Sequence, residues 1–380
     1  MSKPDITSLK IGVLGGGQLG RMMIQSAINY NLDISVIDPD PNAPCAHLVE
    51  NFSVGKLTDE EAIYDWGKGF DLITIEIENV SVPALKRLQN EGVKVYPQPE
   101  IIELIQDKRK QKTFYKANRI PTADFVLTEN QADVASKKGW LPAVNKLGTE
   151  GYDGRGVQVL RSEEDLSMAF DKPGLLERLV DFDKELSVVV ARNESGEMKC
   201  FPVVQLEYHP EANLVEFLFA PAEISSEAEQ KAYELAEDVI SKLGMVGLLA
   251  VEMFLTREGE LLVNEVAPRT HNSGHHTIEA NDTSQFEQHL RSILNLPLGS
   301  TVLRSPAAMV NLLGEEGFTG DAKYEGMEAC MAMSGVYVHL YGKKLTKPFR
   351  KMGHVTITDA NIESLKAKTR KVKETLKVKT

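Results

Sequence analysis

The first hundred residues alternate between short apolar runs and segments with a helical period. Apolar runs at 11–14, 34–37 and 93–96 predict buried strands, and 19–30 predicts a helix after the first of them. Residues 72–78 alternate isoleucine with threonine or glutamate, which predicts a further strand. Strands separated by helices are typical of a parallel sheet, so this part is predicted to be α/β.

The middle of the chain changes to strands around a glycine-rich loop. Asp107 is a candidate N-cap for a helix at 108–117. Apolar strands on both sides are predicted to enclose the loop GTEGYDGRG, residues 148–156. The region 186–221 is rich in strand-forming residues and is predicted to be antiparallel.

Two capping patterns mark helices in the second half. Ser226 and Glu229 form a capping-box pattern, which predicts a helix that ends at Leu243 before Gly244. Ser284 is predicted to begin another helix that stops before Pro297. Residues beyond about 300 are predicted to form a small β-rich C-terminal domain.

Composition narrows the class of protein. With 380 residues, two or three domains are expected, and 42% apolar with 26% charged residues is ordinary for a globular protein. A net charge of −12 argues against nucleic acid as the partner. Three dispersed cysteines show neither metal spacing nor a disulfide framework, which favours a reducing, cytoplasmic setting. No apolar run predicts a membrane span or a secretory signal.

A glycine cluster near the N-terminus indicates an anion site. Gly15, Gly17 and Gly20 match the pattern G-x-G-x-x-G between a strand and a helix, and Asp38 ends the next strand. Glycines allow close approach of the backbone to phosphate, and a helix N-terminus attracts an anion. A dinucleotide, another phosphate ligand and structural packing remain open.

Two glutamates in the segment AVEMFLTREGELLVNEVAPR indicate a cation site. If Glu258-Gly259 is the centre of a hairpin, cross-strand partners have numbers that sum to 517, which places Glu252 opposite Glu265. Opposed carboxylates repel each other, and a magnesium ion relieves the repulsion. Asn264 adds another oxygen. The alternative is a solvent-facing hairpin in which the repulsion is screened.

Several residues together resemble the nucleotide site of the ATP-grasp superfamily. Lys146 precedes the glycine-rich loop, and a fixed cation beside backbone N–H groups suits a polyphosphate. The resemblance is carried by Lys108, Lys146, the loop 148–156, the Glu177–Glu185 segment and the Glu252/Glu265 pair.

Five motifs in order extend the resemblance to almost the whole chain. They are GGGQLGRMM at 15–23, ITIEIEN at 73–79, EGYDGRG at 150–156, NEVAPRTHNSGHHT at 264–277 and FRKMGH at 349–354. Together they are similar to the N5-carboxyaminoimidazole ribonucleotide synthetase family of purine biosynthesis. The resemblance implies carboxylation of 5-aminoimidazole ribonucleotide with ATP and bicarbonate, through carboxyphosphate, with release of ADP and phosphate. A homodimer is also expected from it.

The resemblance also implies a domain organisation. Residues 1–103 are expected to form a Rossmann-like substrate-binding domain that precedes the ATP-grasp fold. Residues 104–300 are expected to form the ATP-grasp domain, with a lid subdomain at 104–182 and a central subdomain with the metal site at 183–300. Residues 301–380 are expected to form the β-rich C-terminal domain. The fold class is thus α/β and α+β.

The resemblance implies a role for each candidate residue. ATP contacts are expected from Lys108, Lys146, Gly151, Tyr152, Asp153, Gly154, Gly156, Glu177, Leu179, Val180, Glu185, His209, Asn264 and Glu265. Ribonucleotide contacts are expected from Gly17, Gln18, Leu19, Glu76, Tyr152, Asp153, Arg155, Arg269, Asn272, Ser273, His275, Lys343, Arg350 and Lys351. Glu252 and Glu265 are expected to hold magnesium or manganese. Arg269, His271 and Lys351 are expected to act in catalysis, with His271 as proton acceptor.

Three rival functions predict different behaviour. Another ATP-grasp enzyme, such as a formate-using transformylase, would release ADP with a different acid or acceptor. A dehydrogenase would bind NAD tightly at the glycine cluster and leave the carboxylate pair unexplained. A non-catalytic scaffold would need broken site residues, and none of the expected residues is missing.

Overall fold

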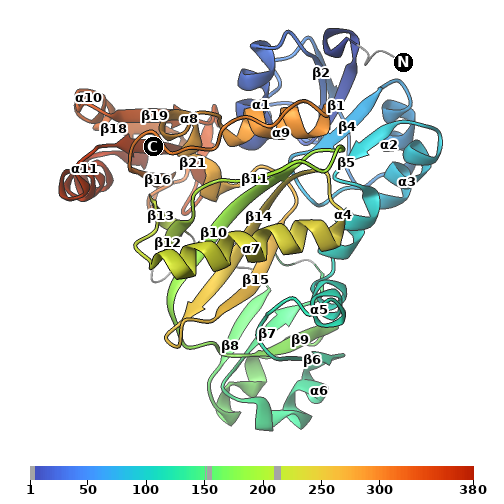
Figure 1. Ribbon diagram of the computed structural model, residues 1–380, viewed down its shortest axis with the longest axis vertical. Coiled ribbons are helices and arrows are strands. Elements are labelled where there is room, and N and C mark those ends of the chain that lie inside the picture. Colours follow the sequence, from blue (N-terminus) through green and yellow to red (C-terminus); the bar gives the residue numbers. More distant parts are fainter. Residues whose placement is uncertain (1–4, 150, 152–155, 209–214) are drawn as a thin grey trace.

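The N-terminal part is a parallel sheet with helices on both faces (Figure 1). The computed structural model describes residues 5–149, 151, 156–208 and 215–380. The strand order is β3-β2-β1-β4-β5, and all four pairings are parallel, as predicted. The strands are β1 (Lys10–Leu14), β2 (Asp33–Asp38), β3 (Asn51–Val54), β4 (Leu72–Ile75) and β5 (Lys94–Tyr96), and the helices are η1 (Ile6–Ser8), α1 (Gln18–Ile28), α2 (Glu60–Gly67) and α3 (Val82–Asn90).

Strand β4 is shorter than the alternating pattern predicted. It ends at Ile75, and residues 76–78 leave the sheet as a bend. The carboxylate of Glu76 turns back to α1, where it accepts hydrogen bonds from the amides of Gly17 at 2.7 Å and Gly20 at 2.8 Å. The amide of Glu76 still donates to the carbonyl of Leu14 at 3.0 Å, but the contact of its side chain with α1 is tertiary and strand periodicity cannot report it.

Two short helices connect the N-terminal sheet to a small four-stranded subdomain. Helix α4 (Pro99–Ile105) contains the expected boundary at 103, and α5 (Lys108–Ala117) has its predicted bounds with Asp107 as N-cap. The subdomain lies at the bottom of Figure 1 and has the antiparallel strand order β6-β9-β7-β8. Its elements are β6 (Phe125–Thr128), α6 (Gln131–Ser136), η2 (Lys138–Trp140), β7 (Ala143–Leu147), β8 (Val157–Leu160), η3 (Glu163–Met168) and β9 (Gly174–Arg178).

A large antiparallel sheet forms the centre of the molecule. Its first strands are β10 (Phe182–Arg192), β11 (Met198–Cys200), β12 (Val204–Tyr208), β13 (Val215–Ala220), β14 (Gly247–Thr256) and β15 (Leu261–Ala267). One face is covered by α7 (Ser226–Leu243), against which Leu186, Val188 and Val190 of β10 pack. The other face meets α9 (Gln285–Ile293), which also packs on α1. The shorter elements η4 (Asn272–Gly274) and α8 (Thr277–Ala280) precede α9.

The N-cap of α7 lies one residue earlier than the capping-box pattern predicted. Ser225 is the N-cap, and its side chain accepts a hydrogen bond from the amide of Ala228 at 3.2 Å. Ser226 is already the first helical residue. Gly244 ends the helix in the left-handed conformation at φ 62°, as its position in the sequence predicted.

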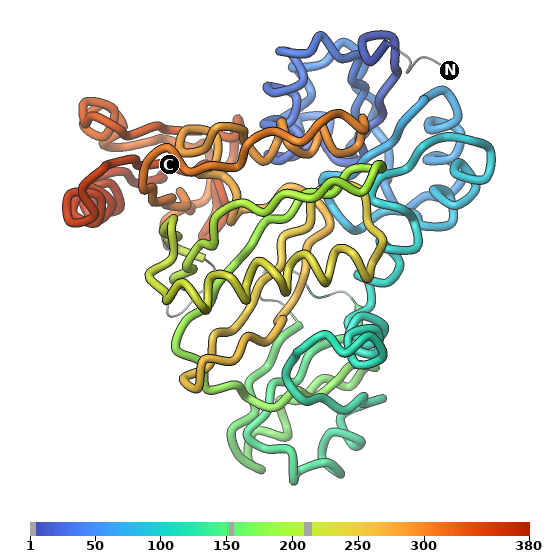
Figure 2. The backbone as a smooth tube through the Cα atoms, in the orientation of Figure 1, coloured from blue at the N-terminus to red at the C-terminus, as the bar shows by residue number. Residues whose placement is uncertain are grey.

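The sheet continues without a break into the C-terminal part. Strand β13 pairs with β16 (Ala307–Leu313), which pairs with β21 (Lys351–Thr358) and then β19 (Val336–Leu340). One nine-stranded sheet therefore crosses the expected boundary at 300. Figure 2 shows the connecting segment after α9 running from the N-terminal domain to this part. The other elements of the C-terminal part are β17 (Gly320–Asp321), β18 (Lys323–Glu325), α10 (Met327–Met331), β20 (Leu345–Thr346), α11 (Ile362–Thr375) and β22 (Lys377–Lys379).

In the part of the chain that the structure describes, no helix is both long enough and apolar enough to cross a membrane.

Candidate active site

The predicted carboxylate pair forms, although the hairpin turn differs from the prediction. Glu252 of β14 lies opposite Glu265 of β15. Nearer the turn the partners sum to 516, as in Met253 with Val263, because the loop has an odd length. A β-bulge at Asn264 takes up the difference and restores the predicted register beyond it.

A polar patch lies on the face of the central sheet that α7 does not cover. Ser187 of β10 pairs with Glu252, and Glu185 lies two residues from Ser187 on the same face. Glu265 joins them from the next strand. Further along the same face the residues become apolar and form the core beneath Leu298. The strand period therefore gathers three carboxylates at one end of this face.

The two opposed carboxylates differ in their surroundings. Glu252 is only 7% exposed, and burial raises its pKa well above the ordinary value, with Glu265 and Glu185 adding to the effect. Glu265 is half exposed, and Nζ of Lys108 lies 2.9 Å from its Oε2. The charge of Lys108 outweighs burial and lowers the pKa of Glu265. If both carboxylates ionise, two negative charges lie opposite each other on adjacent strands and repel.

These residues fit a magnesium ion. Magnesium takes oxygen ligands and is usually held by one or two carboxylates together with water and substrate phosphates. Glu252, Glu265 and the amide oxygen of Asn264 supply such a set. Among the residues that the structure describes, no group of three or more His, Cys, Asp or Glu side chains is arranged to hold a metal without other ligands.

A chain of buried charges lies beneath the expected nucleotide site. Glu177 of β9 lies between Lys112 and Lys146, with N–O distances of 2.7 and 2.6 Å. Burial acts to raise the pKa of Glu177, but the two lysines outweigh it, so the pKa is lowered. Lys146 also donates to Oδ1 of Asn264 at 3.1 Å. This chain joins the lid subdomain to the hairpin of the carboxylate pair.

Lys112 is a site residue that the sequence analysis missed. Its side chain is 2% exposed, and burial lowers its pKa to about 8 despite the nearby Glu177. It follows Lys108 by four residues on α5, so both side chains lie on one face of that helix. That spacing was the available signal.

His271 lies next to the carboxylate pair, and Arg269 lies beside Glu78 in the bend after β4. Nε of Arg269 lies 2.9 Å from Oε1 of Glu78, and its Nη1 donates to the carbonyl of Thr270 at 3.1 Å. Nε2 of His271 lies 3.7 Å from Oε1 of Glu252. An imidazole group thus flanks the predicted metal site, and the guanidinium of Arg269 belongs to the same segment, two residues earlier.

The hydrogen bonds of His271 specify its tautomer. The amide of Ser273 donates to Nδ1 at 3.3 Å, so the neutral ring carries its proton on Nε2. The hydroxyl of Ser273 lies 2.9 Å from Nδ1 and 2.9 Å from the hydroxyl of Ser187. Because Nε2 faces Glu252, this arrangement favours His271 as a hydrogen-bond donor over the proton acceptor that we expected.

The structure places His275 behind the site, and this corrects its expected contact with substrate. The side chain is 1% exposed and packs on Phe286, Tyr341 and His354. Its Nδ1 lies 3.1 Å from the amide nitrogen of Gln285. The ring neighbours of His275 come from elements distant in the sequence, which a local pattern cannot report.

Two further residues that the sequence analysis missed fix the segment after β15. Gln285 is fully buried and bonds both the amide of His271 at 2.8 Å and its carbonyl at 2.7 Å. Asn311 exchanges two amide hydrogen bonds with Asn272, at 2.9 and 3.0 Å. No local pattern in the sequence marks either residue, because both contacts are tertiary.

The glycine cluster binds protein carboxylates. Glu76 accepts from the amides of Gly17 and Gly20, and Asp38 accepts from Gly16 at 2.7 Å. A Cβ on Gly17 would lie 2.4 Å from Oε1 of Glu76, so this packing requires glycine. These contacts rule against a dinucleotide phosphate here, while the contact of Gly17 with substrate stays a prediction. Gln18 and Leu19 begin α1 beside this turn, and their contacts with substrate stay predictions.

Lysines of the C-terminal part lie near the carboxylate pair. Nζ of Lys343 donates to the carbonyl of Lys351 at 2.8 Å, and the charge of Lys351 acts to lower the pKa of Glu252. The guanidinium of Arg350 donates to the carbonyl of Leu345 at 2.7 Å. The structure thus brings Lys343 and Lys351 together near the carboxylates and directs Arg350 to β20.

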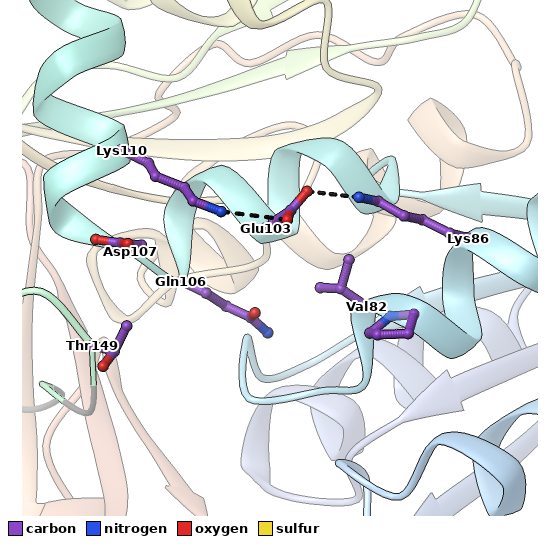
Figure 3. Close-up of a pocket in the computed structure, with 8 residues that line it drawn as sticks. Val82, Lys86, Glu103, Gln106, Asp107, Lys110 and Thr149 are labelled. Atoms are coloured by element: carbon purple, nitrogen blue, oxygen red, sulfur yellow. Dashed lines mark hydrogen bonds and ion pairs between the residues drawn. The ribbon is translucent and has the colours of Figure 1, made fainter.

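The remaining expected ATP contacts are partly outside the described residues. Tyr152, Asp153, Gly154 and His209 lie there, as does Arg155, which was expected to contact the ribonucleotide. Gly151 and Gly156 flank the undescribed part of the loop, and Leu179 and Val180 follow β9 at the entrance to the central sheet. Near this loop, a hollow of about 400 Å³ includes Gln106, Asp107 and Thr149 (Figure 3).

Three families match consecutive parts of the chain. The ribonucleotide synthetase preATP-grasp domain matches residues 8–106, the ATP-grasp domain matches 113–286, and the phosphoribosylaminoimidazole carboxylase C-terminal domain matches 307–368. The chain is therefore an ATP-grasp protein with a preATP-grasp domain before it and this C-terminal domain after it.

Relatives along the whole chain give the family. The N5-carboxyaminoimidazole ribonucleotide synthase of Bacillus subtilis is 38% identical, with 91% of this chain and 90% of the relative covered. The N5-carboxyaminoimidazole ribonucleotide synthetase structure from Thermotoga maritima is 44% identical with a TM-score of 0.90, covering 98% of this chain and 99% of that one. The chain belongs to the N5-carboxyaminoimidazole ribonucleotide synthetase family.

Two other comparisons bear on length and ligands. The chloroplastic phosphoribosylaminoimidazole carboxylase of Vigna aconitifolia is 39% identical over 94% of this chain, which spans only 65% of that longer protein. The N5-carboxyaminoimidazole synthase of Aspergillus clavatus, solved with ADP and 5-aminoimidazole ribonucleotide, is 32% identical with a TM-score of 0.87, covering 97% of this chain and 98% of that one.

Proposed function

We propose that the protein is an ADP-forming carbon–nitrogen ligase that carboxylates the 5-amino group of 5-aminoimidazole ribonucleotide with ATP and bicarbonate. The observation that carries the proposal is the pair Glu252 and Glu265, with Lys108 beside Glu265, Lys146 bonded to the adjacent Asn264 and His271 beside Glu252. The ligands of the Aspergillus clavatus relative support the same substrates.

The nucleotide end of the site would hold ATP through its lysines. Lys108 and Lys146 offset the negative charge of the phosphates, and the buried Glu177 keeps Lys146 in place. Glu252 and Glu265 would hold magnesium, which when bound lowers the charge on the phosphate oxygens. Glu185, on the same face of the sheet, is proposed to accept hydrogen bonds from the ribose hydroxyls.

The first proposed step activates bicarbonate. An oxygen of bicarbonate forms a bond to the γ-phosphorus of ATP, and the bond to the β-phosphate oxygen breaks with its electron pair leaving on ADP. The product is carboxyphosphate. Arg269 is proposed to offset the charge of this anion, and the Nε2–H group of His271 is proposed to donate to one of its carboxyl oxygens.

The second step forms the carbon–nitrogen bond. The amine attacks the carboxyl carbon, either of carboxyphosphate or of carbon dioxide released from it inside the closed site. The carbon–oxygen bond to phosphate breaks, and phosphate takes the proton that the amine loses. Lys343 and Lys351 are proposed to bind the substrate phosphate from the C-terminal side. The loop 148–156 is proposed to close over the site and exclude water.

Localisation and assembly stay proposals. Three free cysteines suit a reducing cytoplasm. The homodimer expected from the family is tested by light scattering during size-exclusion chromatography, where a single 42.1 kDa species would contradict it.

The proposed function is tested by ADP release in degassed buffer with magnesium and ATP. We expect ADP release to need the ribonucleotide, and an acid-labile carboxylated product to form only when bicarbonate is added. Formate in place of bicarbonate is the control for the transformylase alternative. ADP release that depends on formate, or on another acceptor, would contradict the substrate assignment while preserving the nucleotide site.

A further inference from the structure

The carboxylate of Glu78 reaches the reaction centre from a different domain. It lies in the bend after β4 of the N-terminal sheet, whereas Arg269 follows β15 of the central sheet. Oε1 of Glu78 lies 2.9 Å from Nε of Arg269, and the two side chains are 24% and 19% exposed. The contact is an ion pair without hydrogen-bond geometry at Nε, so the Glu78 carboxylate restrains the position of the guanidinium by charge and close approach.

The bend that carries Glu78 is itself held by Gln106. Its side-chain nitrogen donates to the carbonyl of Glu78 at 2.7 Å and to that of Val80 at 3.0 Å. Figure 3 shows Gln106 extending from the end of α4 toward the segment that leads to Val82. One amide thus fixes the backbone on both sides of Asn79.

Gln106 lies two residues before Lys108, which contacts both the glycine-rich loop and the carboxylate pair. Two residues later, the amide of Lys108 donates to the carbonyl of Gly148 at 2.8 Å, at the start of the glycine-rich loop. Nζ of Lys108 contacts Glu265. The segment 106–108 therefore contacts the Glu78 bend, the loop and the carboxylate pair within three residues.

From these contacts we propose that Glu78 is a positioning residue that orients the guanidinium of Arg269 in the reaction centre, and that Gln106 fixes the bend that presents Glu78. The proposal rests on the proposed function, in which Arg269 holds the activated bicarbonate. A misplacement of about 1 Å in such a group can reduce a rate by roughly 100-fold. The alternative is that the ion pair only docks the N-terminal domain on the central sheet.

The chain offers matched controls for that alternative. Lys94 of β5 and Glu194, in the turn after β10, form another ion pair between the same two parts of the molecule, at 2.8 Å. Gln98, at the other end of α4, bonds the carbonyl of Gly244 at 2.9 Å and the amide of Val246 at 3.0 Å. Glu194→Gln and Gln98→Ala remove equivalent interdomain contacts far from the reaction centre.

The experiment measures product formation, ADP release and thermal midpoint for Glu78→Gln, Glu78→Asp and Gln106→Ala beside the two controls. We expect Glu78→Gln to lower kcat for carboxylated product by roughly 100-fold and to raise the KM for bicarbonate, while the KM for ATP and the thermal midpoint stay close to those of Glu194→Gln. Glu78→Asp should recover part of the rate. Gln106→Ala, which keeps the charge of Glu78, should lower kcat by about tenfold, and Gln98→Ala should not.

Two results would overturn the proposal. One is an unchanged kcat and bicarbonate KM in both Glu78→Gln and Gln106→Ala. The other is an equal loss of activity in the control variants, which would assign the contacts to domain docking. Wild-type enzyme that forms no carboxylated product would instead contradict the proposed function, because that result does not involve the variants.

Discussion

Three carboxylates, Glu185, Glu252 and Glu265, lie on one face of the central sheet, and their pKa values shift in different directions. Lys108 lowers the pKa of Glu265, whereas burial raises the pKa of both other residues. Glu252 therefore destabilises the folded protein when it ionises without a cation nearby. Functional sites often keep such unfavourable groups because the ligand compensates for them.

Replacing Glu252 should lower the activity and raise the stability of the ligand-free protein. Glu252→Gln keeps the shape and removes the charge, so the ligand-free protein should gain about 0.5–2 kcal/mol in free energy of unfolding. ADP release should fall by at least roughly 100-fold, because a carboxylate for the metal is lost. Urea unfolding and the ADP assay measure the two effects. A destabilised variant that keeps its activity would contradict this interpretation.

Glu185 should make stability depend on pH. Burial raises its pKa to about 7 from 4.5. Because the folded pKa is higher than the unfolded one, folding favours the protonated form, and this contribution is present below pH 4.5 and is lost as pH rises through 7. Glu185→Gln should therefore be more stable than wild type at pH 8, by at most about 3 kcal/mol, and equally stable near pH 4.5. A difference that is the same at both pH values would contradict the assignment.

At the scale of helices and strands, local signals were reliable where the cause was local. Asp107 fixes the start of α5 through its side chain and Gly244 fixes the end of α7 through its left-handed backbone, and both ends were predicted. The end of β4 and the turn of the hairpin differed from the prediction. Glu76, directly after β4, makes tertiary contacts with the start of α1, and the odd loop length shifts the hairpin register until the bulge at Asn264 restores the pairing of Glu252 with Glu265.

The corrected N-cap of α7 has a direct test. Ser225→Ala removes the hydrogen bond to the amide of Ala228 and should cost about 1 kcal/mol. Ser226→Ala, the matched control, should change the free energy of unfolding by less than about 0.5 kcal/mol. Urea midpoints measured by circular dichroism compare the two. A larger cost for Ser226→Ala would restore the original capping-box interpretation.

On the scale of the whole molecule, the site depends on contacts between segments that are far apart in the sequence. Glu78 comes from the N-terminal sheet, Lys146 from the lid subdomain, Glu252 from the central sheet and Lys351 from the C-terminal strands. Motifs identified most of these residues. Lys112, Gln285 and Asn311 were missed and His275 was misplaced, because their positions follow from packing between distant segments.

The continuous sheet predicts that the C-terminal part is needed for folding. A chain that ends at residue 300 would expose the edge of β13 where Phe217 to Ala220 pair with β16, and Phe217 and Phe219 would lose apolar neighbours. An exposed, apolar strand edge promotes association. We therefore expect the shortened chain to aggregate in size-exclusion chromatography with light scattering. A soluble, monodisperse chain that binds ATP would show that the boundary at 300 separates independent domains.

The most direct test of the account follows oxygen from bicarbonate into phosphate. The enzyme is incubated with magnesium, ATP, 5-aminoimidazole ribonucleotide and ¹⁸O-labelled bicarbonate, and the released phosphate is analysed by mass spectrometry. Attack of bicarbonate on the γ-phosphorus transfers one labelled oxygen to each phosphate, whether carboxyphosphate or released carbon dioxide then meets the amine. Unlabelled phosphate alongside carboxylated product would contradict activation of bicarbonate by ATP at this site.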